Sequence, residues 1–226
     1  MTARLAGRSL YLCTPDRPDL ERFLASCIAG GVDIVQLREK DLPDATLVAR
    51  ARTAAKVCAD AGVPFLLNDR PDLAVEAGAD GAHVGQDDLA PGRARALLGP
   101  EALLGLSTHV PDELARAAAE PVDYVSAGPV VATPTKPGRP GTGLDYLRLA
   151  ARTERPWFVT GGVTPDAVPG LVAAGARRFV VVRWLTEAAD PTAAARALCD
   201  AIARAGAAEI EGDPLRGPAT DGPSSP

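Results

Sequence analysis

The sequence predicts an α/β fold, a single-domain (β/α)8 or TIM barrel, from three observations. Short apolar runs alternate with helical patterns along almost the whole chain. Eight such pairs can be placed, and they repeat at roughly 20–30 residues, as a (β/α)8 barrel requires. Unusual polar residues fall where the strands end, which is where such barrels carry their catalytic groups. A doubly wound open sheet is the alternative.

We interpret the apolar runs as strands and the segments between them as helices. The expected strands are residues 9–13, 33–38, 64–68, 81–84, 102–107, 123–127, 157–160 and 178–183. The expected helices are residues 20–29, 44–61, 73–76, 92–98, 112–119, 144–151, 166–174 and 191–204. Pro169 and Gly170 should kink or shorten the seventh helix. We expect residues 1–206 to form the barrel domain, and residues 207–226, rich in Pro, Gly and Ser, to form a disordered tail.

The stretch from Pro64 to Asp88 contains a strand–helix–strand unit with an acidic residue after each strand. The first strand ends in Asn68-Asp69, and Asp88 follows the second. Because neighbouring parallel strands lie about 4.8 Å apart, the two carboxylates can reach one point in space. Two carboxylates with an amide nearby suit a hard cation such as Mg²⁺. The alternative is that Asp69 and Asp88 cap the helices that follow them.

Composition narrows the class of protein. A chain of 226 residues with 46% hydrophobic content can bury one large core. Its net charge of −5 and lack of a Lys/Arg-rich run argue against a nucleic-acid partner. We find no run long enough to span a membrane and no signal-like N-terminus, and we therefore expect a cytoplasmic protein without a membrane partner. The cysteines lack metal-type spacing and are interpreted as reduced apolar fillers: Cys13, Cys27, Cys58 and Cys199.

The second strand runs into Gln36-Leu37-Arg38-Glu39-Lys40. A side-chain period of two puts Gln36, Arg38 and Lys40 on one face. If that face looks into the barrel, an amide and two cations line its mouth, which is costly unless they meet an anion. The alternative is an ordinary charged turn in solvent.

The fifth strand ends at Ser107, and His109 follows two residues later. A serine so near a histidine suggests a hydrolase. We reject that interpretation because the chain has no Gly-x-Ser-x-Gly turn and no acidic partner is indicated. His83, on the fourth strand, is interpreted as a hydrogen-bonded residue of a barrel layer rather than a base.

The loop after the sixth strand places two hydroxyls and a lysine among prolines and glycines, at Thr133, Thr135 and Lys136. Such a loop can close over an anion and offer backbone N–H groups to it. The alternative is a solvent loop with incidental charge.

Glycines and an arginine mark the ends of the last two strands. The seventh strand ends in Thr160-Gly161-Gly162 and the eighth in Val182-Arg183. Loops after these strands commonly cradle a phosphate, which paired glycines allow to approach the backbone closely. The residues together predict a diphosphate site with a cation and a separate monophosphate site. Such a pair suggests group transfer from a diphosphate ester to a phosphorylated acceptor.

A set of short motifs occurs along the chain in the order QLREK, NDR, GQDD, TPTK and TGG. From about Tyr11 to Leu185 the chain thereby resembles the thiamine phosphate synthase family, also called thiamine-phosphate pyrophosphorylases. Each motif is weak alone, but the ordered set is highly specific. The resemblance implies a transferase of thiamine biosynthesis that joins 4-amino-2-methyl-5-(diphosphooxymethyl)pyrimidine to a thiazole phosphate. The products would be thiamine phosphate and pyrophosphate.

The resemblance also implies the roles of individual residues. The pyrimidine diphosphate would contact Gln36, Arg38, Lys40, Asn68, Ser107 and Lys136. The thiazole phosphate would contact Thr133, Thr135, Gly162, Val182 and Arg183. Mg²⁺ would be held by Asp69 and Asp88. The predicted catalytic residues are Arg38, Lys40, Ser107 and Lys136.

The implied mechanism is dissociative, with pyrophosphate leaving before the thiazole nitrogen traps the pyrimidine carbocation. The chain departs from the family at Arg183, where many members carry serine. Because arginine is itself a strong phosphate ligand, we interpret this as a variation of the monophosphate site.

Two alternatives to a synthase are considered. One is a thiazole tautomerase-like barrel, which would not need Asp69, Asp88 and Lys136 together. The other is a non-catalytic barrel that binds thiamine phosphates. The sequence leaves the oligomeric state open, with a homo-oligomer among the alternatives.

Overall fold

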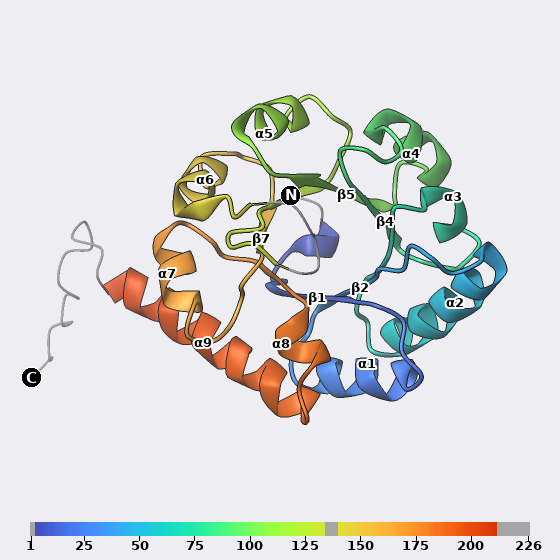
Figure 1. Ribbon diagram of the computed structural model, residues 1–226, viewed down its shortest axis with the longest axis horizontal. Helices are drawn as coiled ribbons and strands as arrows, with labels where there is room; N and C mark the ends of the chain where they lie inside the picture. Colours follow the sequence, from blue (N-terminus) through green and yellow to red (C-terminus); the bar gives the residue numbers. More distant parts are fainter. Residues whose placement is uncertain (1–2, 134–139, 212–226) are drawn as a thin grey trace, which may run out of the picture.

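The computed structural model is a closed barrel of eight parallel strands inside a ring of helices (Figure 1). It describes residues 3–133 and 140–211. The first strand pairs with both the second and the eighth, so the sheet is closed. The predicted TIM barrel is confirmed, and the open-sheet alternative is excluded.

The strands lie within two residues of the predicted boundaries. They are β1 Leu10–Thr14, β2 Ile34–Leu37, β3 Phe65–Asn68, β4 Gly81–Val84, β5 Leu103–Thr108, β6 Tyr124–Ala127, β7 Trp157–Thr160 and β8 Phe179–Val181. The helices are η1 Ala3–Leu5, α1 Leu20–Ala29, α2 Asp44–Asp60, α3 Pro71–Ala74, α4 Pro91–Leu98, α5 Pro111–Ala117, α6 Gly143–Ala150, α7 Val168–Ala173, α8 Arg183–Thr186 and α9 Pro191–Glu211.

Helices η1 and α8 were not predicted and α9 is longer than predicted, whereas α7 is short, as Pro169 and Gly170 led us to expect. The eighth strand ends at Val181, and Arg183 begins the unexpected helix α8, because Val182 leaves the extended conformation with φ −121° and ψ −89°. Helix α7 is short, with Pro169 in its first turn, where proline costs no hydrogen bond. Helix α9 continues past Arg204 to Glu211, through an alanine-rich segment of high helix propensity. Residues 207–211, expected in the tail, are therefore helical.

The barrel interior changes from apolar to polar along its axis. Since side chains alternate between the two faces of a strand, every second residue points inward. At the amino-terminal end these residues are apolar, and at the carboxyl end they are polar and still buried. The buried polar side chains at the carboxyl end are Gln36, Asn68, His83, Ser107 and Ser126. The sequence pattern thus builds a polar chamber on top of an apolar plug.

A layer of aromatic rings separates these two regions. Tyr11 and Tyr124 each pack edge-on against Phe158, with ring centroids 5.5 and 5.2 Å apart. All three side chains are at most 1% exposed. Below them the interior is closed by Leu5 of η1, which is fully buried. Helix η1 itself, the short dark-blue helix, lies near the middle of the barrel in Figure 1.

Three aspartates close the amino-terminal end of the barrel, and we call their contacts the aspartate clasps. Asp33, Asp80 and Asp123 directly precede β2, β4 and β6. Each carboxylate accepts a backbone N–H at the start of the preceding strand, a donor that would otherwise lack a partner. The distances are 3.0 Å to Leu10 N, 2.9 Å to Phe65 N and 2.8 Å to Leu104 N.

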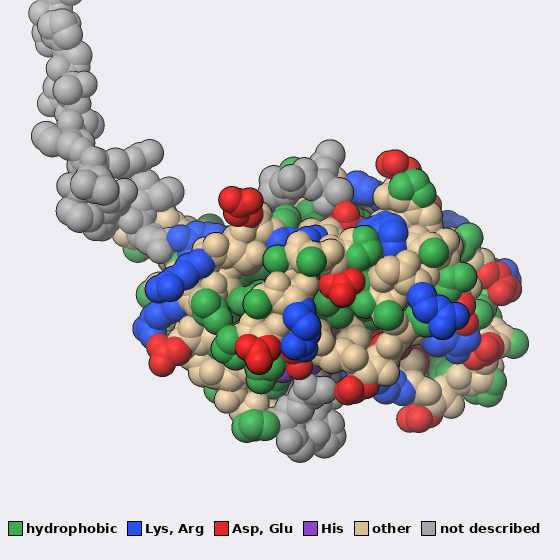
Figure 2. Space-filling view, turned by 90° about the horizontal axis from the view of Figure 1, so that it is seen from above, with side chains coloured by type: hydrophobic (Ala, Val, Ile, Leu, Met, Phe, Trp, Pro, Cys, Tyr) green, Lys and Arg blue, Asp and Glu red, His purple; other side chains and the backbone are tan. Residues whose placement is uncertain are grey.

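Helix α9 covers the outside of the barrel, where it lies against α1, α7 and α8 (Figure 1). It approaches the end of α1 so closely that a Cβ on Gly30 would lie 2.5 Å from the Thr192 carbonyl oxygen. On the face drawn in Figure 2, Lys and Arg side chains lie among Asp and Glu side chains. Within the described residues, no helix is both long enough and apolar enough to cross a membrane.

The Asp33 clasp predicts a pH dependence of stability. Burial raises the pKa of Asp33 to about 6, although its hydrogen bonds oppose the rise. The native state therefore binds a proton more tightly than the unfolded chain does, and this contribution to stability is lost as the pH rises from about 4 through 6. Relative to Asp33→Asn, the wild-type free energy of unfolding should fall by up to about 3 kcal/mol across that interval. Urea denaturation between pH 4 and 7 measures it, and a constant difference between the two proteins would contradict the prediction.

Candidate active site

A cavity of about 500 Å³ opens at the carboxyl ends of the strands. Its lining brings together residues predicted separately from the ends of different strands. The predicted site residues in this lining are Gln36, Arg38, Asn68, Ser107, Thr133, Gly162, Val182 and Arg183. Lys40, Asp69 and Asp88 are not part of the lining. Thr135 and Lys136 lie outside the described residues.

Two side-chain amides form part of the cavity wall. Gln36 ends the inward face of β2, and Asn68 ends that of β3. Asn68 is 5% exposed, and its Nδ2 has no hydrogen-bond partner among the described residues. A buried amide donor without a partner is costly, so this atom is suited to an acceptor on a ligand.

A chain of hydrogen bonds crosses the floor of the cavity. It begins with Cys13 Sγ on Gln36 Oε1 at 3.2 Å, and Gln36 Nε2 donates to Tyr11 Oη at 2.6 Å. Tyr11 Oη lies 3.0 Å from Tyr124 Oη, which lies 3.0 Å from His83 Nδ1. The expectation that His83 is a hydrogen-bonded residue of the barrel layer is confirmed.

The chain of hydrogen bonds ends at two serines. His83 Nε2 lies 2.9 Å from Ser107 Oγ, and Ser126 Oγ donates to Ser107 Oγ at 3.4 Å. Spacing in sequence suggested His109 as the neighbour of Ser107. Instead, Nδ1 of His109 is hydrogen-bonded to the carbonyl oxygen of Gly128.

Asp69 and Asp88 meet beside the cavity, hydrogen-bonded to each other through their carboxyl groups. Burial raises the pKa of Asp88, and its hydrogen bond to Asp69 raises it further. Burial alone would also raise the pKa of Asp69, but the hydrogen bond to Asp88 and the ion pair with Lys40 bring it below its ordinary value. The two carboxyl groups therefore titrate as an interacting pair, in which Asp88 is the weaker acid.

The positions of these carboxylates are set by their own loops. Asp69 has φ +58°, and it is the only non-glycine residue with positive φ in the described part of the chain. Asp88 Oδ2 accepts the Gly85 N–H at 2.7 Å. Neither α3 nor α4 has a side-chain cap, so the helix-capping alternative for Asp69 and Asp88 is wrong.

The acidic pair could hold a cation only with help from a ligand. No group of three His, Cys, Asp or Glu side chains suited to a metal occurs within residues 3–133 and 140–208. Magnesium typically uses one or two carboxylates and completes its shell with water and substrate phosphates. Two adjacent carboxylates at the edge of a chamber therefore fit Mg²⁺ delivered together with a phosphorylated substrate.

The two cations of the QLREK motif take different positions. Because β2 ends at Leu37, its period of two no longer governs Arg38 and Lys40. Arg38 lines the cavity. Lys40 lies outside it and pairs with Asp69, with Nζ 2.8 Å from Oδ2.

Glycines form the opposite wall of the cavity. Gly161 and Gly162 have φ +90° and +76°, a region that side chains disfavour. A Cβ on Gly162 would also lie 2.5 Å from Val131 Cγ2. The bare backbone at this turn leaves room for a ligand, as the paired glycines suggested.

Helix α8 completes this wall with residues that the sequence prediction missed. Trp184 and Glu187 line the cavity beside Arg183. Trp184 Nε1 donates to the Ala194 carbonyl of α9 at 3.1 Å, which ties α8 to α9. The sequence prediction extended the eighth strand to Arg183, so the helix that begins there was not expected.

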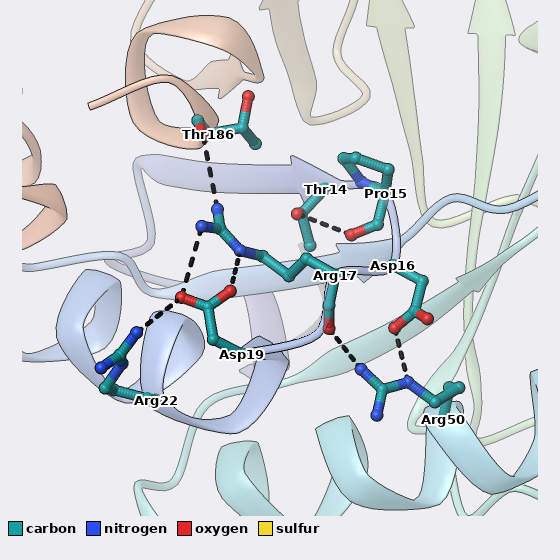
Figure 3. A network of polar contacts seen from close by, with 8 residues as sticks. All are labelled: Thr14, Pro15, Asp16, Arg17, Asp19, Arg22, Arg50 and Thr186. Atoms are coloured by element: carbon teal, nitrogen blue, oxygen red, sulfur yellow. Dashed lines mark hydrogen bonds and ion pairs between the residues drawn. The ribbon is translucent and has the colours of Figure 1, made fainter. Parts of the chain in front are cut away.

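The loop after β1 is held from three sides (Figure 3). Arg50 of α2 reaches Asp16 Oδ1 at 2.6 Å and donates to the Arg17 carbonyl. Arg17 pairs with Asp19 at 2.5 Å and extends to the carbonyl of Thr186, the last residue of α8, at 3.4 Å. Arg17 thus connects the first loop of the barrel to the helix that carries Arg183.

Known proteins resemble this chain closely. The chain matches the family model described as thiamine monophosphate synthase over residues 10–185. The thiamine-phosphate synthase of Mycobacterium bovis is 47% identical over 218 residues, covering 90% of this chain and 98% of that protein. The thiamine-phosphate synthase of Thermus thermophilus is 48% identical over 201 residues, covering 86% of this chain and 96% of that protein.

Solved structures share the fold. The thiamine phosphate pyrophosphorylase of Pyrococcus furiosus superposes with a TM-score of 0.80 at 24% identity, covering 87% of this chain and 96% of that one. A 3-hexulose-6-phosphate synthase superposes with a TM-score of 0.63 at 23% identity, covering 85% and 99%. At these identities the likeness supports the barrel fold alone.

The contact between Arg17 and α8 predicts a local effect on opening of this helix. Arg17→Ala should increase hydrogen exchange of the α8 amides about fivefold, the value of one hydrogen bond of about 1 kcal/mol. Arg22→Ala is the matched control, because Arg22 shares Asp19 at 3.1 Å but its side chain is 82% exposed. Hydrogen–deuterium exchange read by mass spectrometry measures both variants. Equal exchange of α8 in the two variants would show that Arg17 does not hold the helix.

Proposed function

The chain belongs to the thiamine monophosphate synthase family, and we propose that it synthesises thiamine phosphate in the cavity at the barrel mouth. The substrates are 4-amino-2-methyl-5-(diphosphooxymethyl)pyrimidine and a thiazole phosphate, and pyrophosphate is the second product. The observation that carries this assignment is the gathering of residues from the QLREK, NDR, TPTK and TGG motifs in the lining of one cavity. A cytoplasmic location stays a prediction from the sequence.

The diphosphate end of the proposed site lies at the ends of β2, β3 and β5. Gln36, Asn68 and Ser107 bind the pyrimidine diphosphate there, and Arg38 pairs with its phosphate oxygens. The buried, unpartnered Nδ2 of Asn68 supports this assignment, since an acceptor from a substrate would satisfy it. Lys40 is assigned to the diphosphate as well, and it would leave Asp69 to reach it. Lys136 remains a proposal from the family resemblance.

Asp69 and Asp88 are the proposed ligands of Mg²⁺. Their donor set is hard and anionic, and the pair stands next to the proposed diphosphate. When bound, Mg²⁺ would supply positive charge that stabilises the departing pyrophosphate. The protein's own contribution is to hold both carboxylates at one point.

The monophosphate end is assigned to Gly162, Val182 and Arg183, with Thr133 at the rim. The open backbone of the glycine turn and the positive charge of Arg183 support binding of the thiazole phosphate at this wall. Thr135 belongs to the same assignment by resemblance. The two phosphate ends then lie on opposite walls, which leaves the space between them for the two rings.

In the proposed mechanism the residues act by position and charge. Arg38, Lys40 and Lys136 stabilise the negative charge that develops on the pyrophosphate as its C–O bond breaks. The pyrimidine carbocation is then attacked by the thiazole nitrogen, which the monophosphate contacts hold in line. Below the two substrate rings the cavity is closed by the aromatic layer of Tyr11, Tyr124 and Phe158. This layer limits the access of water to the pyrimidine carbocation.

A synthase differs from the two alternatives in what it releases. A thiazole tautomerase-like barrel would release no pyrophosphate, and a non-catalytic barrel would bind thiamine phosphates without turnover. Pyrophosphate release that requires both substrates, with stoichiometric thiamine phosphate, tests the proposal. Release without the thiazole phosphate, or no release at all, would overturn it.

The acidic pair predicts which carboxylates the reaction needs. Asp69→Asn and Asp88→Asn should each lower turnover at least about 100-fold, because a bound metal is worth several kcal/mol to a developing anion. Asp87→Asn is the matched control, since Asp87 is adjacent but exposed. Turnover is measured across a Mg²⁺ titration, with circular dichroism to confirm folding. Wild-type turnover in both single variants would show that Asp69 and Asp88 do not form a metal site needed for the reaction.

Arg183 predicts a selective effect on the acceptor. A charge-assisted hydrogen bond to phosphate is worth about 1.5–3 kcal/mol, or roughly 10- to 150-fold in affinity. Because Arg183 is exposed, we expect the lower end of that range: Arg183→Ala should raise KM for the thiazole phosphate about tenfold and leave KM for the pyrimidine diphosphate unchanged. Arg116→Ala, an exposed arginine on α5, is the control. Unchanged kinetics for both substrates would show that Arg183 is not part of the monophosphate site.

A further inference from the structure

The hydrogen-bond chain on the cavity floor has a direction. At its start the Cys13 thiol donates to Gln36 Oε1, so the Gln36 amide presents Nε2 to Tyr11. An amide nitrogen can only donate, and therefore Tyr11 Oη accepts at this position. The single hydroxyl hydrogen of Tyr11 is then directed to the next group in the chain, Tyr124 Oη.

Both phenols keep the hydrogen that this direction requires. Burial raises the pKa of Tyr11 and of Tyr124 well above the usual range of a phenol. Tyr124 Oη accepts from Tyr11, so its own hydrogen goes to His83 Nδ1 at 3.0 Å. A ring nitrogen that accepts a hydrogen bond carries no proton.

The neutral imidazole of His83 consequently carries its proton on Nε2, which faces Ser107 Oγ at 2.9 Å. Ser107 Oγ accepts this hydrogen and a second one from Ser126 at 3.4 Å. Because both lone pairs of Ser107 Oγ are then occupied, Ser107 can bind a further partner only through its hydroxyl hydrogen. Ser107 lines the cavity, so it acts there as a donor.

This polarity is the reverse of the one in a serine nucleophile. There the histidine nitrogen accepts the serine proton. Here the phenol of Tyr124 prevents that arrangement, and the geometry is that of a fixed donor. His109 provides an internal contrast, because its Nδ1 faces a carbonyl oxygen and must therefore carry a proton.

Gly105 makes the contact between Tyr124 and His83 possible. A Cβ at this position would overlap Tyr124 Cζ and His83 Nδ1. The residue lies between Leu103 and Ser107 on the inward face of β5. The lack of a side chain on Gly105 thus leaves the space in which the Tyr124 phenol reaches the His83 imidazole.

We propose that Tyr11, Tyr124 and His83 are positioning residues that fix Ser107 as a hydrogen-bond donor to the pyrimidine diphosphate. The recipient is an acceptor atom of that substrate, either a ring nitrogen or a diphosphate oxygen. The inference rests on the proposed function for the identity of the substrate. The tautomer of His83 in the free protein does not depend on it.

The tautomer is measured directly by nitrogen NMR of protein labelled at its two histidines. His109→Gln assigns the signals. In the wild type at pH 7.5, His83 should show a protonated Nε2 and an unprotonated Nδ1, and His109 a protonated Nδ1. In Tyr124→Phe the Nδ1 acceptor loses its donor, and the His83 signals should shift toward a mixture of tautomers. A wild-type His83 protonated on Nδ1, alone or on both nitrogens, would overturn the proposal.

Kinetics then separate positioning from general stability. Tyr124→Phe should lower kcat/KM for the pyrimidine diphosphate about tenfold, the size of one misdirected hydrogen bond. The KM for the thiazole phosphate should not change. Tyr11→Phe, which leaves the Tyr124 donor in place, should keep the tautomer and lose less activity. Tyr146→Phe is the matched control, because it deletes another buried phenol outside the chain of hydrogen bonds.

Two results distinguish this inference from the proposed function. If the wild type makes thiamine phosphate but Tyr124→Phe matches Tyr146→Phe in kcat/KM, the positioning role is wrong and the synthase stands. If the wild type shows the expected tautomer but releases no pyrophosphate, the polarity stands and the substrate assignment fails. Thermal denaturation of each variant establishes that the comparison is between folded proteins.

Discussion

The layer of Tyr11, Tyr124 and Phe158 across the middle of the barrel is the constraint on which the site depends. The rings fill the interior where eight strands converge. Their hydrocarbon faces seal the apolar plug below, and their hydroxyls turn upward into the chamber, as amphipathic aromatic residues allow. A layer of purely aliphatic side chains would fill the same volume but remove the phenol that Gln36 Nε2 and His83 Nδ1 each contact. The packing that closes the barrel is therefore also the polar floor of the cavity.

A second constraint is the electrostatic balance of Asp69, Asp88 and Lys40 at the barrel mouth. Two half-buried carboxylates side by side would repel each other if both were ionised. The ion pair between Lys40 and Asp69 offsets this repulsion, and burial together with the hydrogen bond to Asp69 raises the pKa of Asp88. The ion pair is reversible, since a flexible lysine can swing away. A cation arriving with a diphosphate would thus find a site that is neutralised but not blocked.

Sequence reasoning succeeded where one strand determines the outcome. The period of two places Gln36, Asn68 and Ser107 inside the barrel, and the parallel order brings their ends together. It failed where the backbone leaves the strand, as at Arg183, which begins α8, and at Lys40, beyond the end of β2. Loop and helix starts depend on tertiary packing that no local pattern records.

The hydrogen-bond chain on the cavity floor also could not be predicted from the sequence. It joins residues as distant as Tyr11 and Tyr124, whose contact follows only from the closure of the barrel. His83 was correctly expected to be hydrogen-bonded, but its partners could not be named. Trp184 was missed because nothing in its spacing marks it, and it lines the cavity only through the position of α8.

The aspartate clasps bear on how such a barrel can assemble. Each clasp joins the start of one strand to the start of the next, across separations of 23, 15 and 19 residues. Loops of that length close at little entropic cost, so each strand–helix–strand unit can form its own junction before the ring is complete. This pattern favours assembly of the first six strands in pairs, and the last two strands lack such an aspartate. The contacts that favour local assembly and the residues proposed for catalysis thus lie at opposite ends of the same strands.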